Sequence, residues 1–352
     1  MIHNFFEIFL TIKFLLIGLF LVLWVLSFYW KQIFKFLNLK SYKNIQRAHS
    51  DEVSRLGGFI IYIYLLLICL LGFSKDFFIF CLLLSSLPFV IVALREDLYH
   101  DTSPFLRLIS MIISCLFFFY MNPIEFPSIE IPYLGNLISI YPISIIFFTF
   151  SILIIMNGMN LIDGMNGLFV FTALFQLLSL AIVANIFDDF EILNISFILS
   201  LPLILFLLFN FPFGKIFIGD LGAYFYGFAI SLLTIYFFGK HQELLSWSAV
   251  LLLFYPSAEL LYSYLRKIIN KQSPMHPDNE HLHSLIFNRL KKNKKTQSLS
   301  NTKTTLILSF FWIFPPILFV NYNENIFTTL LSIIVLSTLY ISMYKSVKKG
   351  GK

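Results

Sequence analysis

Long apolar runs separated by short polar stretches dominate the chain. Windows of about 20 apolar residues, the length that crosses a bilayer as a helix, predict eleven membrane spans at 8–30, 56–73, 77–94, 104–121, 139–156, 167–186, 193–210, 221–239, 245–265, 304–320 and 326–344. Between the fourth and fifth spans, the alternation over residues 126–133 favours a small β-hairpin. The pattern predicts an all-α polytopic membrane protein of ten or eleven transmembrane helices, organised as one integral membrane domain over residues 1–352.

The composition supports this prediction. Hydrophobic residues make up 58% of the chain and charged residues only 12%, which excludes a soluble domain with a large core. The first apolar run, about Ile8–Tyr29, is too long for a signal peptide and has no basic segment before it, so we interpret it as an uncleaved span. The three cysteines lie in apolar runs and predict no disulfide framework, and nothing suggests nucleic-acid binding.

Positive charges fall almost entirely on one side of these spans. That side holds the loops 31–55, 95–103, 157–166, 211–220 and 266–303 and the basic tail 345–352, and together with Arg107 these segments carry 22 of the 25 Lys and Arg residues. By the positive-inside rule this side is cytoplasmic, with the N-terminus outside and the C-terminus inside. An odd number of spans agrees with that orientation.

Five polar or glycine-rich segments lie on the same predicted cytoplasmic side. They are Arg47–Gly58, Arg95–Asp101, Met156–Gly167, Asn210–Gly222 and Ser273–His283. One site assembled from five loops explains this arrangement better than five independent polar loops do.

Two of these segments carry carboxylates at predicted span ends. Glu96 and Asp97 are adjacent, and adjacent carboxylates repel each other unless a cation neutralises them. They suit a general base or a Mg²⁺-linked role, whereas a solvated loop paired with Arg95 is the alternative. Asp220 lies between two glycines at the start of an apolar span. It either caps the helix that follows or holds a metal ion, because an anion without a partner is costly there.

The stretch Met156–Gly167 reads MNGMNLIDGMNG and has a polar residue at every third position, namely Asn157, Asn160, Asp163 and Asn166. On a helix such a row winds around the surface. Amide and carboxylate oxygens beside glycine suit phosphate, sugar or a hard cation. A polar loop between membrane spans is the alternative interpretation.

The two remaining segments, with the residue Phe217, supply basic and aromatic groups. His281 and His283 are two residues apart, so an extended backbone turns both to the same side. Without a Cys or a third close ligand zinc is disfavoured, and imidazoles near phosphates are the better functional interpretation. Arg47 and His49 fit anionic phosphate, although the positive-inside rule alone also predicts cations there. Phe217 either stacks on a nucleobase or packs against lipid or protein.

In this order and spacing the segments resemble the motifs of the polyprenyl-phosphate N-acetylhexosamine-1-phosphate transferase family, bacterial membrane enzymes of the WecA and TagO types. NGMNLIDGMNG resembles the family's Asn-x-x-Asn-x-x-Asp-Gly-x-(Asp/Asn)-Gly pattern, and IFIGDLG resembles its Phe-x-Gly-Asp-x-Gly. SPMHPDNEHLHS is similar to its Ser-Pro-Phe-x-Pro-Asp-x-x-His-(Ile/Leu)-His-His loop, and RAHSDEVSRLGG to its basic-x-His…Arg-x-Gly-Gly entry to the second span. The resemblance covers about residues 44–290.

The resemblance implies transfer of a sugar-1-phosphate, expected to be N-acetylhexosamine-1-phosphate, from a UDP-sugar to undecaprenyl phosphate, with release of UMP. This reaction would be the first membrane step of a surface glycan such as O-antigen or teichoic acid. It implies Mg²⁺, with Mn²⁺ as the alternative ion, and a multi-pass protein of the bacterial inner (cytoplasmic) membrane whose active site faces the cytoplasm; a homodimer stays open. By position it implies catalytic roles for Asp97, Glu96 and Asp163, metal ligands Asp220 and Asn160, nucleotide-binding residues Phe217 and Asn166, and phosphate- or sugar-binding residues Arg47, His49, His281 and His283.

Three positions depart from the family's motifs and leave alternatives open. Glu96 stands where the family usually has Asp, Asn166 where many members have Asp, and Ser284 where a further His is usual. A catalytically impaired homologue with an assembly role is therefore one alternative. A membrane transporter is another, but we find neither mid-span charges nor paired broken helices of the kind it would need, apart from Glu259.

Overall fold

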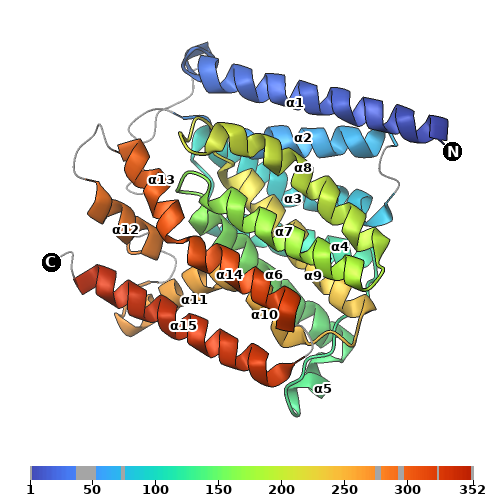
Figure 1. Ribbon diagram of the computed structural model, residues 1–352, viewed down its shortest axis with the longest axis vertical. Helices are drawn as coiled ribbons and strands as arrows, with labels where there is room; N and C mark the ends of the chain where they lie inside the picture. The colour runs from blue at the N-terminus through green and yellow to red at the C-terminus, as the bar shows by residue number, and fades with distance from the viewer. Residues whose placement is uncertain are drawn as a thin grey trace.

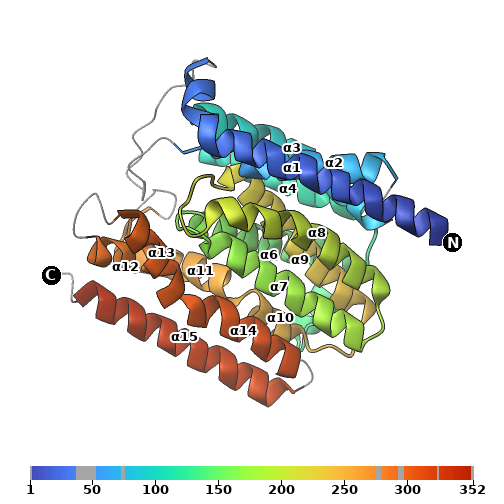
Figure 2. The same ribbon diagram turned by 45° about the horizontal axis from the view of Figure 1, so that its top comes forward.

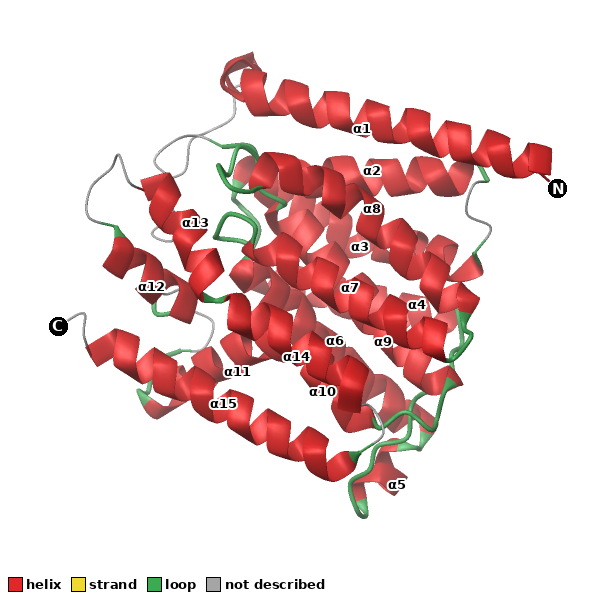
Figure 3. Cartoon of the chain, viewed as in Figure 1, coloured by secondary structure: helices red, strands yellow, loops and turns green. Residues whose placement is uncertain are grey.

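A computed structural model describes residues 2–36, 53–72, 76–273, 279–291, 297–322 and 325–349. Over these ranges the chain forms helices and no strand (Figure 3). The helices are α1 (Ile2–Phe36), α2 (Gly57–Leu70), α3 (Phe77–Tyr99), α4 (Pro104–Met121), α5 (Leu134–Ile138), α6 (Tyr141–Ile162), α7 (Leu168–Ile186), α8 (Phe190–Asn210), α9 (Gly219–Lys240), α10 (Ser246–Leu252), α11 (Phe254–Ile269), α12 (Leu282–Leu290), α13 (Gln297–Ile307), α14 (Ser309–Tyr322) and α15 (Ile326–Lys349).

The helices coincide with the predicted spans. Eight helical segments of the described residues are long and apolar enough to cross a membrane, one of them formed by α13 and α14 together, and the bent pair α10 and α11 would make a ninth. Two shorter apolar helices, Phe14–Trp30 within α1 and Gly57–Leu70, match the first two predicted spans. The prediction of an all-α polytopic membrane protein is therefore confirmed.

Two helix boundaries differ from the predicted spans. The fifth span was expected to end at residue 156, but α6 continues to Ile162. The helix continues because its polar side chains find partners within the bundle, as Asn160 does by donating to the Tyr224 hydroxyl at 2.7 Å. The expected cytoplasmic loop 157–166 is therefore partly helical. Likewise α13 begins at Gln297, inside the expected loop 266–303.

The predicted β-hairpin at residues 126–133 is wrong. All of these residues are described, and they form an irregular segment that leads into α5. Pro127 and Pro132 have no N–H to donate to a strand ladder. Instead, the side chain of Gln242 forms hydrogen bonds with the backbone of this segment. It accepts from the Ser128 N–H at 2.9 Å and donates to the Phe126 carbonyl at 3.1 Å.

The helices pack as one bundle around α9 (Figures 1 and 2). The apolar window of α9 is 94% buried, with α2, α3, α6 and α7 packed against it. Glycines let the backbones meet: a Cβ on Gly58 of α2 would lie 2.3 Å from the Gly222 Cα, and a Cβ on Gly227 would lie 2.7 Å from the Met156 Cα of α6. The start of α9 is therefore held rigidly between neighbouring helices.

The chain ends lie at opposite ends of this bundle. In Figure 1 the N-terminus lies on the right and the C-terminus on the left. The short helix α5 lies at the end away from the C-terminus. Because Gln242, just after α9, contacts the segment before α5, the C-terminal end of α9 lies there, and α9 begins toward the opposite end.

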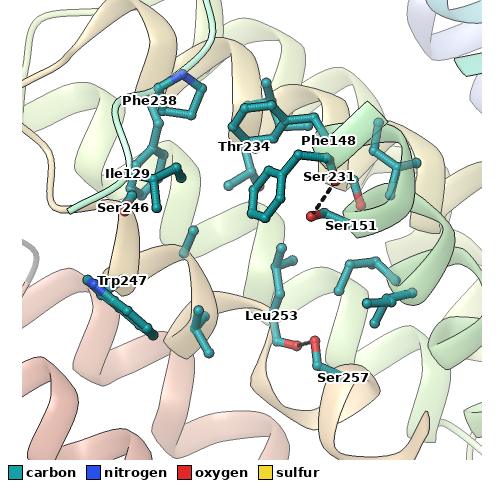
Figure 4. Close-up of a pocket in the computed structure, with 18 of the residues that line it drawn as sticks. Ile129, Phe148, Ser151, Ser231, Thr234, Phe238, Ser246, Trp247, Leu253 and Ser257 are labelled. Atoms are coloured by element: carbon teal, nitrogen blue, oxygen red, sulfur yellow. Dashed lines mark hydrogen bonds between the residues drawn. The ribbon is translucent and has the colours of Figure 1, made fainter. Parts of the chain in front are cut away.

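Helices α10 and α11 form a sharply bent pair. They meet at an 85° bend, and with α6 and α9 they line a cavity of about 300 Å³. Figure 4 shows Phe148, Phe238, Trp247 and Leu253 around it.

Candidate active site

A short backbone pairing places residues 54–58, the end of the predicted polar segment Arg47–Gly58, against the start of α9. Ser54 and Ile216 form an isolated parallel bridge, and the Phe217 N–H donates to the Ser54 carbonyl at 2.8 Å. The N–H groups of Gly57 and Gly58 donate in turn to the carbonyls of residues 217 and 218, at 3.1 and 2.8 Å. This pairing brings Arg55 beside Asp220, 165 residues away along the chain.

Two carboxylates from other segments cap the first turn of α9. Asp97, near the end of α3, accepts from the N–H groups of Asp220 at 2.8 Å and Leu221 at 3.0 Å. Asp163, directly after α6, accepts from the Gly219 N–H at 3.0 Å. The first N–H groups of a helix have no partner within it, so these carboxylates stabilise the helix start. The interpretation of Asp220 as the N-cap of α9 is wrong, because Ile218 holds that position.

Only glycine fits at position 219. Its φ is +76°, in the left-handed region. A Cβ there would lie 2.1 Å from the Arg55 carbonyl oxygen and 2.7 Å from Asp97 Oδ2. The glycine before Asp220 thus lets two carboxylates and the Arg55 backbone converge on one helix start.

Two arginines neutralise Asp220. Arg55 Nη2 lies 2.5 Å from Asp220 Oδ1, and Arg107 Nη1 of α4 lies 3.0 Å from Asp220 Oδ2. Arg55 Nε also lies 3.6 Å from Asp97 Oδ1. Burial lowers the pKa of Arg55, but Asp220, Asp97 and Asp163 outweigh that effect and raise it above the ordinary value. Both guanidinium groups are therefore fixed positive charges in the site.

Of the three aspartates at the start of α9, Asp163 is the one whose negative charge is least compensated by neighbouring groups. Burial raises its pKa well above the ordinary value, with Asp97 and Asp220 adding to the effect, while Arg55 and the Gly219 N–H oppose it. A further cation in the site would favour its ionised form.

The four polar side chains of the segment Met156–Gly167 form hydrogen bonds with different parts of the structure. Asn157 donates to its own helix at the Leu153 carbonyl, 2.8 Å away, whereas Asn160 donates to Tyr224 of α9. Asp163 faces Gly219, as described above. The row winds around the helix end as expected, so only Asn160 and Asp163 face the start of α9.

Asn166 lies against α13. It is fully buried, and its N–H donates to Asn301 Oδ1 at 2.5 Å. Its Nδ2 donates to the Pro212 carbonyl at 2.7 Å and to the Thr302 hydroxyl at 3.2 Å. A carboxylate could not donate these bonds, which gives a physical reason for Asn where many members have Asp. Its nucleotide-binding role stays a prediction, as does that of Phe217, which is 6% exposed.

The adjacent carboxylates Glu96 and Asp97 point to different partners. Glu96 accepts from the Thr102 N–H at 3.0 Å and from its hydroxyl at 2.6 Å, at the turn into α4. Arg95 forms an ion pair with Asp101 at 2.8 Å. Of this segment only Asp97 reaches the start of α9, and the catalytic roles of both carboxylates stay predictions.

His281 and His283 lie beside another buried carboxylate, that of Glu259. The rings of His281 and His283 are parallel, with centroids 5.5 Å apart and 2° between their planes. Their Nδ1 atoms face Glu259 of α11 at 3.8 and 3.2 Å. They point the same way, as predicted for an extended segment, because His281 is extended (φ −78°, ψ 151°) before α12 begins. Arg47 and His49 lie outside the described residues.

The α9 site fits Mg²⁺ by donor type and charge. Asp220, Asp163 and Asn160 present oxygens, which Mg²⁺ prefers, and three carboxylates meet only two guanidinium groups when all are ionised. Among the described residues no group of three or more His, Cys, Asp or Glu forms a ready-made metal cage. The two arginines share Asp220 in this structure.

Sequence reasoning named the carboxylates but missed Arg107 and Tyr224, and it gave Arg55 no role in the site. A signal for Arg107 was its place within an apolar span, where a cation is costly unless it is paired. Tyr224 carried no such signal, because aromatic residues are common throughout this chain.

Comparison with known proteins finds similarity to membrane transferases. Residues 79–238 match the model of glycosyl transferase family 4, a region that holds Asp97, Arg107, Asp163 and Asp220. The chain is 24% identical over 250 residues to a Bacillus subtilis protein named probable undecaprenyl-phosphate N-acetylglucosaminyl 1-phosphate transferase, covering 69% of this chain and 68% of that protein. It is 26% identical over 251 residues to the Thermotoga maritima undecaprenyl-phosphate alpha-N-acetylglucosaminyl 1-phosphate transferase, covering 71% and 73%.

The chain is thus a multi-pass membrane protein in which residues 79–238 are similar to glycosyl transferase family 4. The names of both relatives support the predicted family, the polyprenyl-phosphate N-acetylhexosamine-1-phosphate transferases.

Proposed function

We propose that this protein transfers N-acetylhexosamine-1-phosphate from a UDP-sugar to undecaprenyl phosphate and releases UMP. The observation that carries the proposal is the convergence of Asp97, Asp163 and Asp220 with Arg55 and Arg107 at the start of α9. The names of both relatives support N-acetylglucosamine as the sugar. The product would be the lipid-linked first sugar of a surface glycan.

The arginines suit a reaction between two phosphorylated substrates. Phosphoryl transfer depends mostly on positioning and on neutralising charge as the attacking and leaving oxygens align. Arg55 and Arg107 hold two positive charges at one place, and guanidinium groups bind phosphate oxygens in pairs. We infer that they orient the diphosphate, while Asp97 holds the helix start that carries Asp220.

We infer that Asp220, Asp163 and Asn160 would hold Mg²⁺. The ion supplies positive charge to the diphosphate and to the departing nucleotide. Mn²⁺, which also binds oxygen ligands, is the alternative. The bound cation would favour the ionised form of Asp163, whose pKa is raised by burial.

The cavity lined by α6, α9 and the bent pair α10 and α11 suits the hydrocarbon part of the acceptor. Hydroxyl groups in its lining already have acceptors: Ser151 donates to the Phe147 carbonyl at 2.9 Å, Ser257 to the Leu253 carbonyl at 2.7 Å (Figure 4), and Ser246 to the Glu130 carboxylate. The wall it presents is therefore apolar.

The distribution of cations supports a cytoplasmic site in the bacterial inner membrane.

Release of UMP tests this function directly. Full-length protein in vesicles is supplied with undecaprenyl phosphate, UDP-N-acetylglucosamine and Mg²⁺, and UMP is measured with and without a chelator. We expect UMP release that requires both the lipid phosphate and the divalent cation. A panel of UDP-sugars then identifies the donor. Turnover excludes the alternative of a catalytically impaired homologue, and absence of turnover across the panel contradicts the proposal.

A further inference from the structure

A buried carboxylate outside the α9 site joins three helices. Glu259 of α11 is 1% exposed. Its Oε1 lies 3.2 Å from His283 Nδ1 and accepts from the Tyr255 hydroxyl at 3.1 Å. Its Oε2 lies 3.8 Å from His281 Nδ1, and Tyr340 of α15 also hydrogen-bonds the carboxylate. Two imidazoles and two phenols therefore surround one carboxylate.

The arrangement fixes how the imidazoles face. Nδ1 and Nε2 lie on opposite edges of an imidazole, and an ionised carboxylate can only accept hydrogen bonds. Glu259 therefore favours the form of His283 that carries a proton on Nδ1, whereas His281 Nδ1, at 3.8 Å, lies beyond hydrogen-bond distance. With the rings parallel and both Nδ1 edges toward Glu259, the Nε2 edges of His281 and His283 point away from the carboxylate.

Packing places this cluster next to the helix that carries Asn160. Pro256 lies one turn before Glu259 on α11, and a Cβ on Gly158 of α6 would lie 2.4 Å from its carbonyl oxygen. Gly158 is two residues before Asn160, which in turn bonds Tyr224 of α9. The close contact leaves α11 little freedom relative to α6. The histidine pair is thus held from a helix that is packed directly on one wall of the α9 site.

Burial of the Glu259 carboxylate within a membrane span costs free energy unless its charge is compensated. An ionised group in a membrane span must be paired and hydrogen-bonded, and the packing of α11 alone requires no charge at position 259. A carboxylate behind a ligand-binding histidine orients the ring and sets its tautomer. Glu259 has the geometry of such a group toward His283, and the ring of His281 lies parallel to that of His283.

We propose that Glu259 is a positioning residue that orients His281 and His283 toward the phosphate or sugar of the nucleotide-sugar donor. The proposal rests on the proposed function. Glu259 acts through the two imidazoles and does not itself reach the substrate. Its loss should therefore weaken donor binding and leave the lipid acceptor unaffected.

The first test is kinetic. In full-length protein, Glu259→Gln keeps the shape of the side chain but removes its charge. We expect the KM for UDP-N-acetylglucosamine to rise about tenfold, as for loss of a hydrogen bond to a charged group, while kcat and the KM for undecaprenyl phosphate change less than about threefold. A double variant with His283→Ala should be no worse than His283→Ala alone, because both changes remove the same interaction.

The second test observes the rings themselves. In protein labelled with ¹⁵N-histidine, the side-chain signals of His281 and His283 should change their tautomer pattern in Glu259→Gln. Glu191→Gln is the matched control, because Glu191 also accepts from a tyrosine hydroxyl, that of Tyr236 at 3.0 Å, but contacts neither histidine. It should leave both the signals and the donor KM unchanged.

The outcomes separate the two proposals. If wild-type protein releases no UMP, the proposed function fails, while the histidine signals still test the positioning role. If the wild type is active and folded Glu259→Gln keeps its donor KM and its histidine signals, the positioning role is wrong. Should Glu259→Gln not fold, Tyr340→Phe replaces it. We then expect a donor KM raised about two- to threefold, and an unchanged donor KM overturns the proposal.

Discussion

The two ends of α9 carry ionic clusters built from similar residues but balanced differently. At its C-terminal end, Lys240 Nζ lies 2.7 Å from Asp189 Oδ2 and 3.0 Å from Glu191 Oε2, and His241 Nε2 lies 3.0 Å from Asp189 Oδ2. Asp189 also accepts from the Ile192 N–H at 3.1 Å and so caps α8. Cations at a helix C-terminus and a carboxylate at a helix N-terminus both agree with the helix dipoles. At the N-terminal end, the buried carboxylates of Asp97 and Asp220 and the half-buried carboxylate of Asp163 meet two arginines.

The pKa values of one aspartate at each end shift in opposite directions. Burial tends to raise the pKa of Asp189, but Lys240 and His241 lower it below its ordinary value. Burial raises the pKa of Asp163, and the opposing effect of Arg55 is smaller. The charge of Asp189 is thus balanced by its partners, whereas that of Asp163 is balanced only in part by Arg55. The two clusters thus differ in charge balance rather than in residue type, and we interpret the less balanced one as the candidate site.

The sharpest way to break this comparison is to neutralise one aspartate at each end. Asp220→Asn removes the anion that both arginines hold, and we expect UMP release to fall about 100- to 1000-fold, as for loss of a preorganised electrostatic group. Asp189→Asn should keep more than about half of the activity. A similar loss of activity in both variants would contradict the division into a functional and a structural end.

A second variant tests whether the N-terminal end is also structural. Asp97→Asn replaces an oxygen that accepts from a backbone N–H with an amide NH₂ that cannot accept. We expect the free energy of unfolding to fall by about 1.5–3 kcal/mol, measured by thermal or denaturant unfolding in detergent. Asp101→Asn is the control, because Asp101 is exposed and pairs with Arg95. Equal stability of Asp97→Asn and the wild type would show that the cap of α9 is dispensable.

A third variant adds negative charge near the N-terminal end. Asn166→Asp places a carboxylate against the Pro212 carbonyl and removes two donated hydrogen bonds. We expect a loss of about 1–3 kcal/mol in the free energy of unfolding, and the same unfolding assay measures it. Asn157→Asp is the comparison, since that side chain is only half-buried and bonds its own helix. A stable and more active Asn166→Asp would instead favour direct contact with the nucleotide.

The smallest expected effect concerns pH at the C-terminal end. The pKa of Asp189 is lowered in the folded protein, so its contribution is present above the unfolded value of about 4 and is lost as the pH falls through the folded value. We expect Asp189→Asn to be less stable by about 0.5–1 kcal/mol at pH 7. Unfolding measured between pH 7 and pH 3 should show this difference shrink below about pH 4. A difference that stays constant over the range would refute the assignment.

The carboxylates of the site could be predicted because each interrupts an apolar run. Asp97, Asp163 and Asp220 stand at span ends, where an anion is costly without a partner, and the motif resemblance singled them out. Arg107 could not be assigned, because nothing local indicates that α4 packs beside the start of α9. The partner of Glu259 was equally hidden, since it reaches His283 only through the packing of α11 against α12.

The sequence by itself determined the class of protein and the positions of the apolar helices, because these depend on local hydropathy. Tertiary structure alone decided which polar groups are consumed as helix caps and which meet as a site. Asp97 and Asp220 belong to different motifs of the same chemical type, yet one caps α9 and the other faces two arginines. That difference arises from helix packing across the bundle, which joins residues more than 100 positions apart.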